Sequence, residues 1–368
     1  MMDFLLNDAV ALLRGMVAVP SESFQEEEVA TLLFHSLKGW GLAPARYGNN
    51  IVCKCRNYCA SKPSLVLDAH IDTVAPSSGY TGDPFDSGDD PSVIFGLGSN
   101  DDGGSVVSLA AAFRALDSRN LPINLILALS SEEEKSGPSG ASALYGDTGP
   151  EETRNASWVI VGEPTGMDAA VGERGLLVLD GTAQGKSGHA ARSEGVNALY
   201  IALDDIQKLR DFRFDRISPV MGQTALNVTQ INAGSAHNVI PGECRFTVDV
   251  RFTEQYEPGE ILEMLSGLCR SSLVPRNLRN RASATRTDSP LLKTVEELGI
   301  RTFCSPTSSN WMRTGRDAIK MGPGESFRSH RADEYILVSE IGEAIDKYIT
   351  FIETFCNVNT LEQRNGLH

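Results

Sequence analysis

Histidine and carboxylate residues that could bind a metal ion follow an apolar run early in the chain. His70 and Asp72 come just after the run 65–67, two residues apart, so on an extended segment both side chains face the same way. Asp101 and Asp102 precede a glycine pair that opens a predicted helix at 105–116. A histidine beside a carboxylate is how metal sites fix an imidazole tautomer, although a lone His-x-Asp is more often a surface pair.

Two later apolar runs also end in acidic residues. The run 123–129 (INLILAL) leads into three glutamates at 132–134, and the run 158–161 (WVIV) leads into Glu163. An isolated Glu-Glu-Glu is usually a solvated turn, but parallel strands bring their carboxyl ends to one edge of a sheet. Acids gathered there repel one another unless a cation balances them. Together with His70 they favour Zn²⁺, with Mn²⁺ or Co²⁺ as alternatives, over an all-oxygen calcium site.

Two further histidines lie in segments where they could do chemistry. His330 follows the tight loop Gly-Pro-Gly at 322–324, and His189 is flanked by small residues that leave room around its ring. A histidine in a loop is more often simply exposed to solvent. His35, within a predicted helix, and His368, the last residue of the sequence, are given only a structural or surface interpretation.

The order of the predicted strands and helices that position these residues indicates an α/β fold with an insertion. Strands alternate with helices up to about residue 174, which indicates a mainly parallel mixed sheet with helices on both faces. The segments 176–184, 224–232 and 244–252 instead alternate like strands of a half-exposed antiparallel sheet, with helical spacing at 195–212 and 257–272. We therefore expect a first domain in two segments, 1–175 and 287–368, and an inserted α+β domain at 176–286.

Composition limits the possible partners and location. The chain has 368 residues and a net charge of -15, which argues against nucleic-acid binding because that needs a basic face. It has no apolar run of about 18 residues, so no membrane partner is expected. Acids stand near the N-terminus where a signal peptide would carry positive charge, and the seven cysteines are an odd, mostly scattered number typical of reduced thiols. We expect a cytoplasmic protein.

Seven motifs occur in an order that resembles one family of enzymes. They are HIDTV at 70–74, GLGSNDDGG at 96–104, SSEEEKSG at 130–137, VGEPT at 161–165, GKSGHAA at 185–191, HNVIPGE at 237–243 and GPGESFRSHRADEYI at 322–336. The chain is similar over nearly its whole length to the dinuclear zinc hydrolases that include acetylornithine deacetylase, succinyl-diaminopimelate desuccinylase and bacterial glutamate carboxypeptidase. It departs from many members at Gly103, where they carry Lys, and we expect this to alter local packing more than metal binding.

The resemblance implies a zinc-exopeptidase-like fold, a ferredoxin-like lid or dimerisation domain, and a role for each matching residue. Two Zn²⁺ ions, or Co²⁺ or Mn²⁺, would be bound, with water as co-substrate. His70 and Glu163 would hold the first ion, Glu134 and His330 the second, and Asp101 would bridge them. Asp72 would orient the His70 ring, and Glu133 would be the general base.

The same resemblance places further residues in the inserted domain and predicts a homodimer through it. His189 would donate to the developing oxyanion in the partner's site. Arg174, Asn238 and Arg251 match positions expected to contact the substrate. Arg251 lies in an alternating strand, so it could instead simply pair with Asp249 or Glu254.

The function implied is hydrolysis of an N-acyl amino acid. The short chain and the ending GPG-x5-H-x2-DEY are most similar to deacetylases of acetylornithine or acetylcitrulline in arginine biosynthesis. A desuccinylase acting on succinyl-ornithine or succinyl-diaminopimelate is an alternative, as is a dipeptidase or carboxypeptidase. A catalytically silent relative used for binding is disfavoured because all five implied ligands and Glu133 are present.

Overall fold

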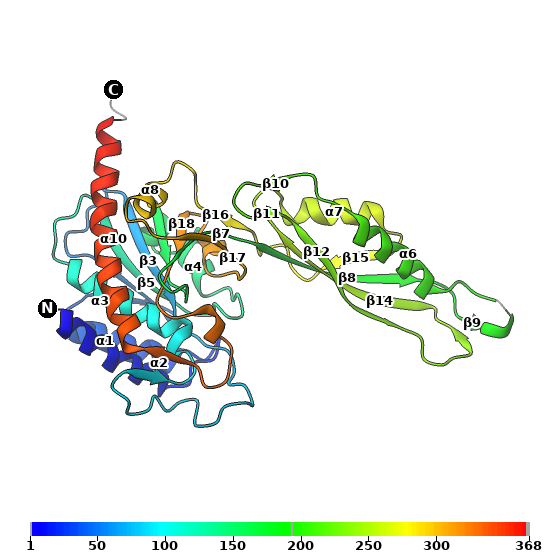
Figure 1. The fold of residues 1–368 in the computed structure, drawn as a ribbon, viewed down its shortest axis with the longest axis horizontal. Coiled ribbons are helices and arrows are strands. Elements are labelled where there is room, and N and C mark those ends of the chain that lie inside the picture. The colour runs from blue at the N-terminus through cyan, green and yellow to red at the C-terminus, as the bar shows by residue number, and fades with distance from the viewer. Residues whose placement is uncertain (1, 193, 366–368) are drawn as a thin grey trace. The chain divides into compact units, whose positions relative to one another are not determined.

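The computed structural model describes residues 2–192 and 194–365, which fall into two compact units. The larger unit comprises Met1–Val171, Thr285–Phe303 and Ser309–His368, and the smaller unit comprises Gly172–Ala284 and Cys304–Ser308. Nearly all of the smaller unit is thus a continuous insertion between two segments of the larger one (Figure 1).

A mixed nine-stranded sheet forms the centre of the larger unit. Its order is β1-β2-β5-β3-β6-β18-β7-β16, with β17 also paired to β7. The strands are β1 (Pro44–Tyr47), β2 (Asn50–Lys54), β3 (Ser64–His70), β5 (Asn124–Ser130), β6 (Trp158–Val161), β7 (Ala169–Glu173), β16 (Ser283–Ala284), β17 (Thr302–Ser305) and β18 (Asp317–Lys320). The central four, β5-β3-β6-β18, are parallel. Every residue of β3 and β5 is buried, as expected for strands covered on both faces.

Helices cover both faces of this sheet and complete two apolar cores. The larger core packs one face against α1 (Met2–Val17), α2 (Glu27–Gly39), α3 (Gly104–Leu116), α8 (Pro290–Glu297) and α10 (Val338–Asn365). The smaller core packs the other face against α4 (Ala141–Tyr145) and α9 (Trp311–Thr314), and α5 (Glu151–Arg154) lies next to α4. Figure 1 shows α10 and α3 side by side. The predicted mixed α/β architecture is confirmed.

The sequence also predicts helices at 21–40 and 338–356, and the structure differs from this at one boundary of each. The acid-rich segment from Ser21 was expected to start a helix, but α2 begins only at Glu27. Before it, Glu22 forms an isolated bridge to Thr73 and residues 23–24 form a turn, because Thr73 exchanges backbone hydrogen bonds with Ser21 and Ser23. The last helix, expected to end near residue 356, continues to Asn365. Tertiary pairing overrides helix propensity at the first position.

The smaller unit is an antiparallel sheet backed by two helices. Its four-stranded sheet has the order β12-β14-β8-β15, formed by β8 (Gly175–Gln184), β12 (Ala225–Ala233), β14 (Glu243–Phe252) and β15 (Ser272–Pro275). The helices α6 (Ala198–Asp211) and α7 (Pro258–Leu268) pack on one face over a separate apolar core. Short ladders β9 (Gly188–His189) with β13 (Val239–Ile240), and β10 (Ile217–Ser218) with β11 (Gly222–Gln223), complete the unit.

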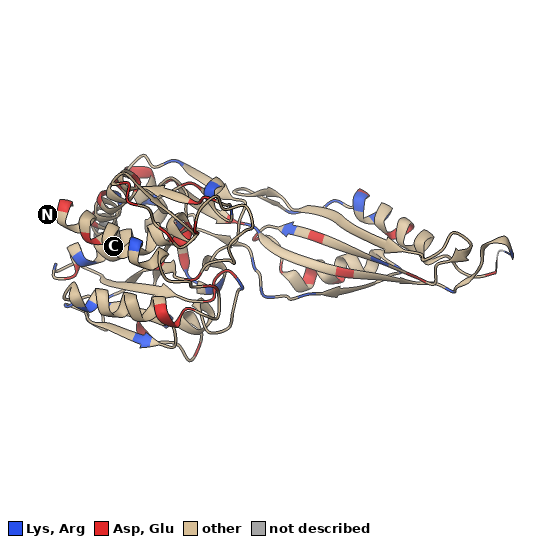
Figure 2. Ribbon diagram, turned by 90° about the horizontal axis from the view of Figure 1, so that it is seen from below, with Lys and Arg blue, Asp and Glu red and all other residues tan. Residues whose placement is uncertain are grey.

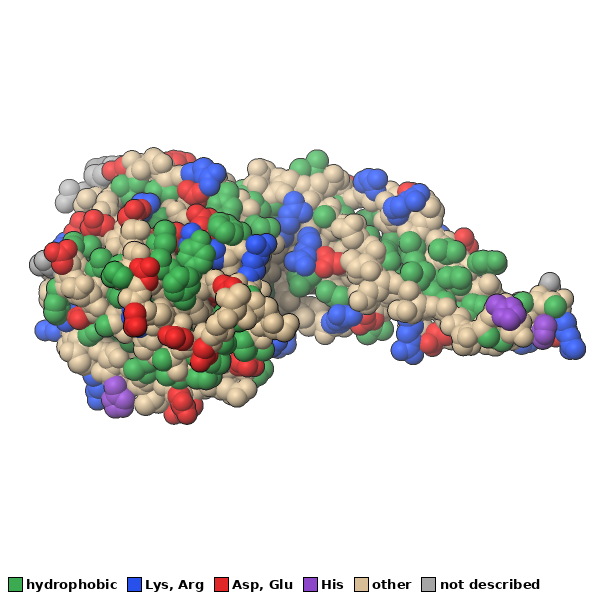
Figure 3. Space-filling view, turned by 60° about the horizontal axis from the view of Figure 1, so that its bottom comes forward, with side chains coloured by type: hydrophobic (Ala, Val, Ile, Leu, Met, Phe, Trp, Pro, Cys, Tyr) green, Lys and Arg blue, Asp and Glu red, His purple; other side chains and the backbone are tan. Residues whose placement is uncertain are grey.

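The distribution of surface side chains agrees with a strongly acidic chain. Asp and Glu occur on helices, strands and loops of both units (Figure 2). On the face seen in Figure 3, acidic and basic side chains are mixed with hydrophobic ones. Among the residues described by the structure, no helix is both long and apolar enough to cross a membrane.

Candidate metal centre

His70 lies at the end of β3 and faces the turn that carries Asp101. Its Nε2 is 3.1 Å from Asp101 Oδ1, and its Nδ1 is 3.0 Å from the main-chain oxygen of Asp72. If Nδ1 donates its proton to that carbonyl, Nε2 of the neutral ring presents a lone pair toward the Asp101 carboxylate. Lone pair and carboxylate are compatible only with a proton or a cation between them. The first predicted ligand pair is thus brought together.

Asp101 also faces a second histidine, as a bridging ligand would. His330 Nε2 lies 3.6 Å from Asp101 Oδ2 and 2.8 Å from Glu134 Oε1. The two oxygens of Asp101 therefore point toward different imidazoles. His330 has a left-handed backbone with φ of 58°, an uncommon conformation for a residue with a side chain. Such outliers gather at functional sites.

Possible ligand atoms form two overlapping groups at this edge of the sheet. Within each group the atoms lie within 4.8 Å of one another, and the groups are His70, Glu133, Glu134 and Asp101, Glu134, His330. Glu163, just beyond β6, belongs to neither group, although Asp101 and Glu133 are near enough to act on its charge. Four of the five predicted ligands are thus connected through Asp101 and Glu134, and the fifth, Glu163, is an electrostatic neighbour.

The carboxylates here are held in surroundings that oppose their charge. Burial, with the nearby charges of Glu134, Asp72 and Asp101, raises the pKa of Glu133 to about 8. Burial also raises the pKa of Glu163 and of Asp102 well above the usual range. Divalent cations among these oxygens and imidazoles would favour the charged carboxylates. The donor set therefore fits a pair of borderline cations such as Zn²⁺.

The Asp72 carboxylate binds the backbone of the segment that carries Glu133 and Glu134, in addition to lying near the His70 ring. Oδ1 accepts from the backbone N–H of Glu133 at 3.0 Å, and Oδ2 accepts from that of Glu134 at 3.1 Å and from Ser23 Oγ at 2.7 Å. Its Oδ1 lies 3.6 Å from His70 Nδ1, farther than the main-chain oxygen. The sequence predicted an orienting role toward His70 but gave no signal for the contact with the loop.

Two buried glutamates near the site were missed by sequence reasoning. Glu26 accepts from the backbone N–H of Phe24 at 2.8 Å and of Glu132 at 3.1 Å. Glu334 accepts from three backbone N–H groups of the segment 98–101. Glu334 stands in a quoted motif, yet its spacing does not indicate which distant segment it contacts.

Asp68 forms a buried polar network below the centre, on the β3 strand that ends at His70. Its carboxylate accepts from Tyr145 Oη at 2.9 Å and from Asn310 Nδ2 at 3.0 Å. Burial raises the pKa of Asp68 to about 6, although these hydrogen bonds oppose the shift. The network joins α4 and the start of α9 to the carboxyl edge of the sheet.

Gly103 lies in closely packed surroundings. A Cβ placed there would collide with the carbonyl oxygen of Gly98 and with a methyl group of Leu13. The turn Ser99–Gly103 therefore passes α1 too closely for any side chain at this position.

His189 lies in the smaller unit, on the short ladder with β13. The side chain is exposed, and its Nδ1 accepts the backbone N–H of Ala191 at 3.2 Å. In the neutral ring the proton is then on Nε2, which is free to donate. Asn238 is adjacent, because its carbonyl accepts the N–H of Ala190 at 3.0 Å. These two predicted residues are thus neighbours at the short ladder formed by β9 and β13, two segments that are distant in sequence.

Arg174 and Arg251 line a separate cavity of about 340 Å³ within the smaller unit. Arg174 donates to the backbone oxygens of Met221 and Gln223. Arg251 pairs with Asp249 through Nε at 2.9 Å and Nη2 at 3.2 Å, the structural alternative considered from the sequence. Cys304, Ser305 and Pro306 complete much of the lining. Both predicted arginines thus line the same cavity, and several of their N–H groups already donate to other atoms of the protein.

Comparison with known protein families identifies two matching segments. The model of the peptidase dimerisation domain of M20 enzymes matches residues 171–277, which cover most of the smaller unit. The model of peptidase family M28 matches residues 50–186, which include His70, Asp101, Glu133, Glu134 and Glu163. The two models describe different peptidase families, and each of them matches less than half of the chain.

Several solved structures share the fold at low sequence identity. Aminopeptidase PepT from Bacillus cereus has a TM-score of 0.76 and 18% identity, over 95% of this chain and 98% of that one. An M20 family metallo-carboxypeptidase from Sulfolobus solfataricus has 0.73 and 17%, over 95% and 99%. The YXEP protein of Bacillus subtilis, described as a dinuclear metal-binding peptidase from the M20 family, has 0.70 and 15%, over 98% and 99%. The chain therefore shares its fold with these peptidase structures, and its inserted segment matches the peptidase dimerisation domain.

Proposed function

We propose that this chain is a hydrolase that uses two divalent cations to remove the acyl group from an N-acyl amino acid. The observation that carries the proposal is the placement of Asp101 between two imidazoles, with Glu133 and Glu134 beside them. Buried acids in such contact are stable as carboxylates only next to positive charge.

The ligands would be shared between two cations. His70 and Glu163 would hold one, Glu134 and His330 the other, and Asp101 would bridge them. When bound, such a pair supplies a water of lowered pKa and polarises the substrate carbonyl. The first choice is Zn²⁺, with Co²⁺ or Mn²⁺ as alternatives, because the donors are imidazoles and carboxylates.

Glu133 would move the proton. Its backbone N–H is fixed by Asp72, so its carboxylate has a defined origin beside the ligands. In the proposed reaction it accepts a proton from the attacking water and returns it to the leaving nitrogen. His189, with its proton on Nε2, would donate to the oxygen that becomes negative. Arg174, Asn238 and Arg251 would contact the substrate, with guanidinium groups suited to carboxylates.

The substrate proposal rests on motif resemblance. Acetylornithine or acetylcitrulline is the first candidate, which would place the enzyme in arginine biosynthesis, and succinylated amino acids are the second. A peptide substrate is favoured by a separate observation, since similar structures carry the names of an aminopeptidase, a carboxypeptidase and a tripeptidase. We further propose a cytoplasmic homodimer formed through the inserted unit, whose residues match a dimerisation domain.

The deciding experiment combines metal loading with a substrate panel. The chain, stripped with chelator and reloaded with Zn²⁺ or Co²⁺, is assayed on N-acetyl- and N-succinyl-ornithine, citrulline and diaminopimelate, and on dipeptides and tripeptides. We expect turnover only after reloading, with two cations bound per chain. Glu133→Gln should keep both cations and lose about 10²–10⁴-fold in kcat. Full activity of the stripped chain, or wild-type turnover by this variant, would refute the proposal.

A further inference from the structure

The most extensive unassigned contact near the metal centre is made by Glu334. Its side chain is 2% exposed, and its two oxygens accept from three backbone N–H groups. Oε1 is 2.9 Å from Asn100 N and 2.8 Å from Asp101 N, and Oε2 is 3.1 Å from Gly98 N. One buried carboxylate thus binds nearly every amide of the segment that leads into the Asp101 side chain.

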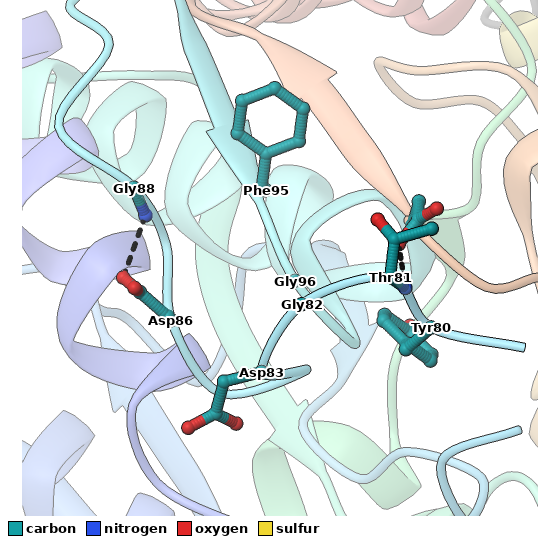
Figure 4. A pocket seen from close by; sticks show the side chains of 9 residues that line it. Tyr80, Thr81, Gly82, Asp83, Asp86, Gly88, Phe95 and Gly96 are labelled. Atoms are coloured by element: carbon teal, nitrogen blue, oxygen red, sulfur yellow. Dashed lines mark hydrogen bonds between the residues drawn. The ribbon is translucent and has the colours of Figure 1, made fainter. Parts of the chain in front are cut away.

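The backbone of Glu334 is itself fixed by strand pairing. Its carbonyl accepts from Gly96 N at 2.9 Å, and the next residues form β19 (Tyr335–Leu337), which pairs with β4 (Val93–Phe95). The neighbouring Asp333 accepts from the N–H and the hydroxyl of Thr81 at 2.9 and 3.1 Å. Figure 4 shows Gly96, Phe95 and Thr81 around the cavity of about 390 Å³ that lies beside this pairing.

The same short segment also carries His330. Three residues lie between His330, whose imidazole contacts Glu134, and Glu334, whose carboxylate binds the Asp101 backbone. Asn100 adds a second link, because its Oδ1 accepts from Glu325 N at 3.0 Å and its Nδ2 donates to Glu325 O at 3.2 Å. The turn 98–101 and the loop 325–334 are therefore joined at both ends of the loop.

We propose that Glu334 is a positioning residue that fixes Asp101 relative to His330 and so sets the spacing of the two cation sites. The inference rests on the proposed function, since it assigns to Asp101 the bridging position. Glu334 touches no reacting atom: it acts on the main chain of Asp101, while the side chain of Asp101 faces the imidazoles. Groups that orient a ligand typically change metal affinity or activity 10–100-fold when they are removed.

The test compares graded substitutions in the full-length chain. Glu334→Ala removes all three acceptors, whereas Glu334→Gln can keep its oxygen on Asn100 and Asp101 and leaves only Gly98 N–H facing an NH₂ group. We expect Glu334→Ala to bind at least one cation about 10–100-fold more weakly, and Glu334→Gln to be intermediate. Affinity is measured by Zn²⁺ competition with a chelator and by visible absorption of the Co²⁺ form.

Asp205 in the smaller unit provides a matched control. It is fully buried and accepts from Arg270 N at 2.9 Å, Ser271 N at 2.8 Å and Ser271 Oγ at 2.8 Å. Asp205→Ala removes a comparable set of bonds from a unit that contains none of the proposed ligands. It should lower the melting temperature and leave cation affinity unchanged.

A second readout is independent of metal and of activity. In the metal-free chain, amide exchange of the peptide spanning 98–101 should be faster in Glu334→Ala than in wild type, and unchanged in Asp205→Ala. If Glu334→Ala does not fold, Glu334→Gln is measured in the same way. Wild-type affinity and exchange in the Glu334 variants would overturn the inference, as would equal loss of affinity in Asp205→Ala. A wild-type chain that binds no cation would instead overturn the proposed function.

Discussion

Replacing Asp72 by Asn tests whether its carboxylate fixes the backbone of Glu133 and Glu134. In wild type this group accepts from Glu133 N, Glu134 N and Ser23 Oγ. Asn has one acceptor oxygen and an NH₂ group that must face an acceptor. The serine hydroxyl can rotate to accept, so the least costly arrangement leaves the N–H of Glu134 opposite the NH₂ group.

The magnitude follows from the bonds that are lost. A hydrogen bond to a charged group contributes about 1.5–3 kcal/mol, and a buried unpaired N–H costs about 1–3 kcal/mol. We therefore expect Asp72→Asn to lower the free energy of unfolding of the metal-free chain by about 2–4 kcal/mol. Because the N–H of Glu134 loses its acceptor and that of Glu133 keeps only a neutral one, the segment that carries the proposed base is held less firmly, and kcat should fall about 10–100-fold.

Saturating cation separates this explanation from a simple loss of metal. The His70 ring keeps its bond to the main-chain oxygen of Asp72, which the substitution does not remove. We expect the loss in kcat to persist at saturating Zn²⁺ and KM to change little. Full recovery of kcat by added Zn²⁺ would refute the proposed role of Asp72 in fixing Glu133 and Glu134. A free energy of unfolding and a kcat equal to those of wild type would refute it as well. Ser23→Ala, which removes only the hydroxyl bond, is the control and should cost about 1 kcal/mol.

Two further predictions concern Asp68 and the subunit arrangement. Folding raises the pKa of Asp68 from 3.8 to about 6, so the folded chain binds more protons between these values and its stability falls by about 3 kcal/mol as the pH rises through that window. Asp68→Asn should make the decline of stability with pH in this window shallower by about that amount in denaturant unfolding of the metal-free chain, and a slope equal to wild type would contradict it. Mixed protomers carrying Glu133→Gln and His189→Ala, each inactive alone, should regain some of the activity if His189 acts in a partner's site; mixtures that remain inactive would indicate a site built within one chain.

Apolar periodicity and turn residues were sufficient to predict the main architecture. The runs 65–67, 123–129 and 158–161 lie in β3, β5 and β6, the neighbouring parallel strands expected to bring their carboxyl ends together. The alternating segments of the insertion became β8, β12 and β14 of an antiparallel sheet. These features follow from local pattern, because a strand covered on both faces must be continuously apolar.

Contacts made by buried carboxylates with distant backbone could not be predicted in this way. Glu26, Asp72 and Glu334 each bind amides between about 60 and 240 residues away, and an acidic residue has the same appearance in a sequence whether it faces solvent or a backbone N–H. The predicted start of α2 was wrong for a related reason, because the pairing of Ser21 with Thr73 is non-local.

The order of the chain has a consequence for synthesis on the ribosome. His70, Asp101, Glu133, Glu134 and Glu163 all precede the inserted unit, whereas His330 and Glu334 follow it. A nascent chain therefore contains these acids long before it contains His330 and Glu334, the residue that binds the Asp101 amide. Under the proposed assignment, the ligands of the first cation would all be synthesised before the inserted unit, whereas the site of the second cation would be completed only when His330 is added late in translation.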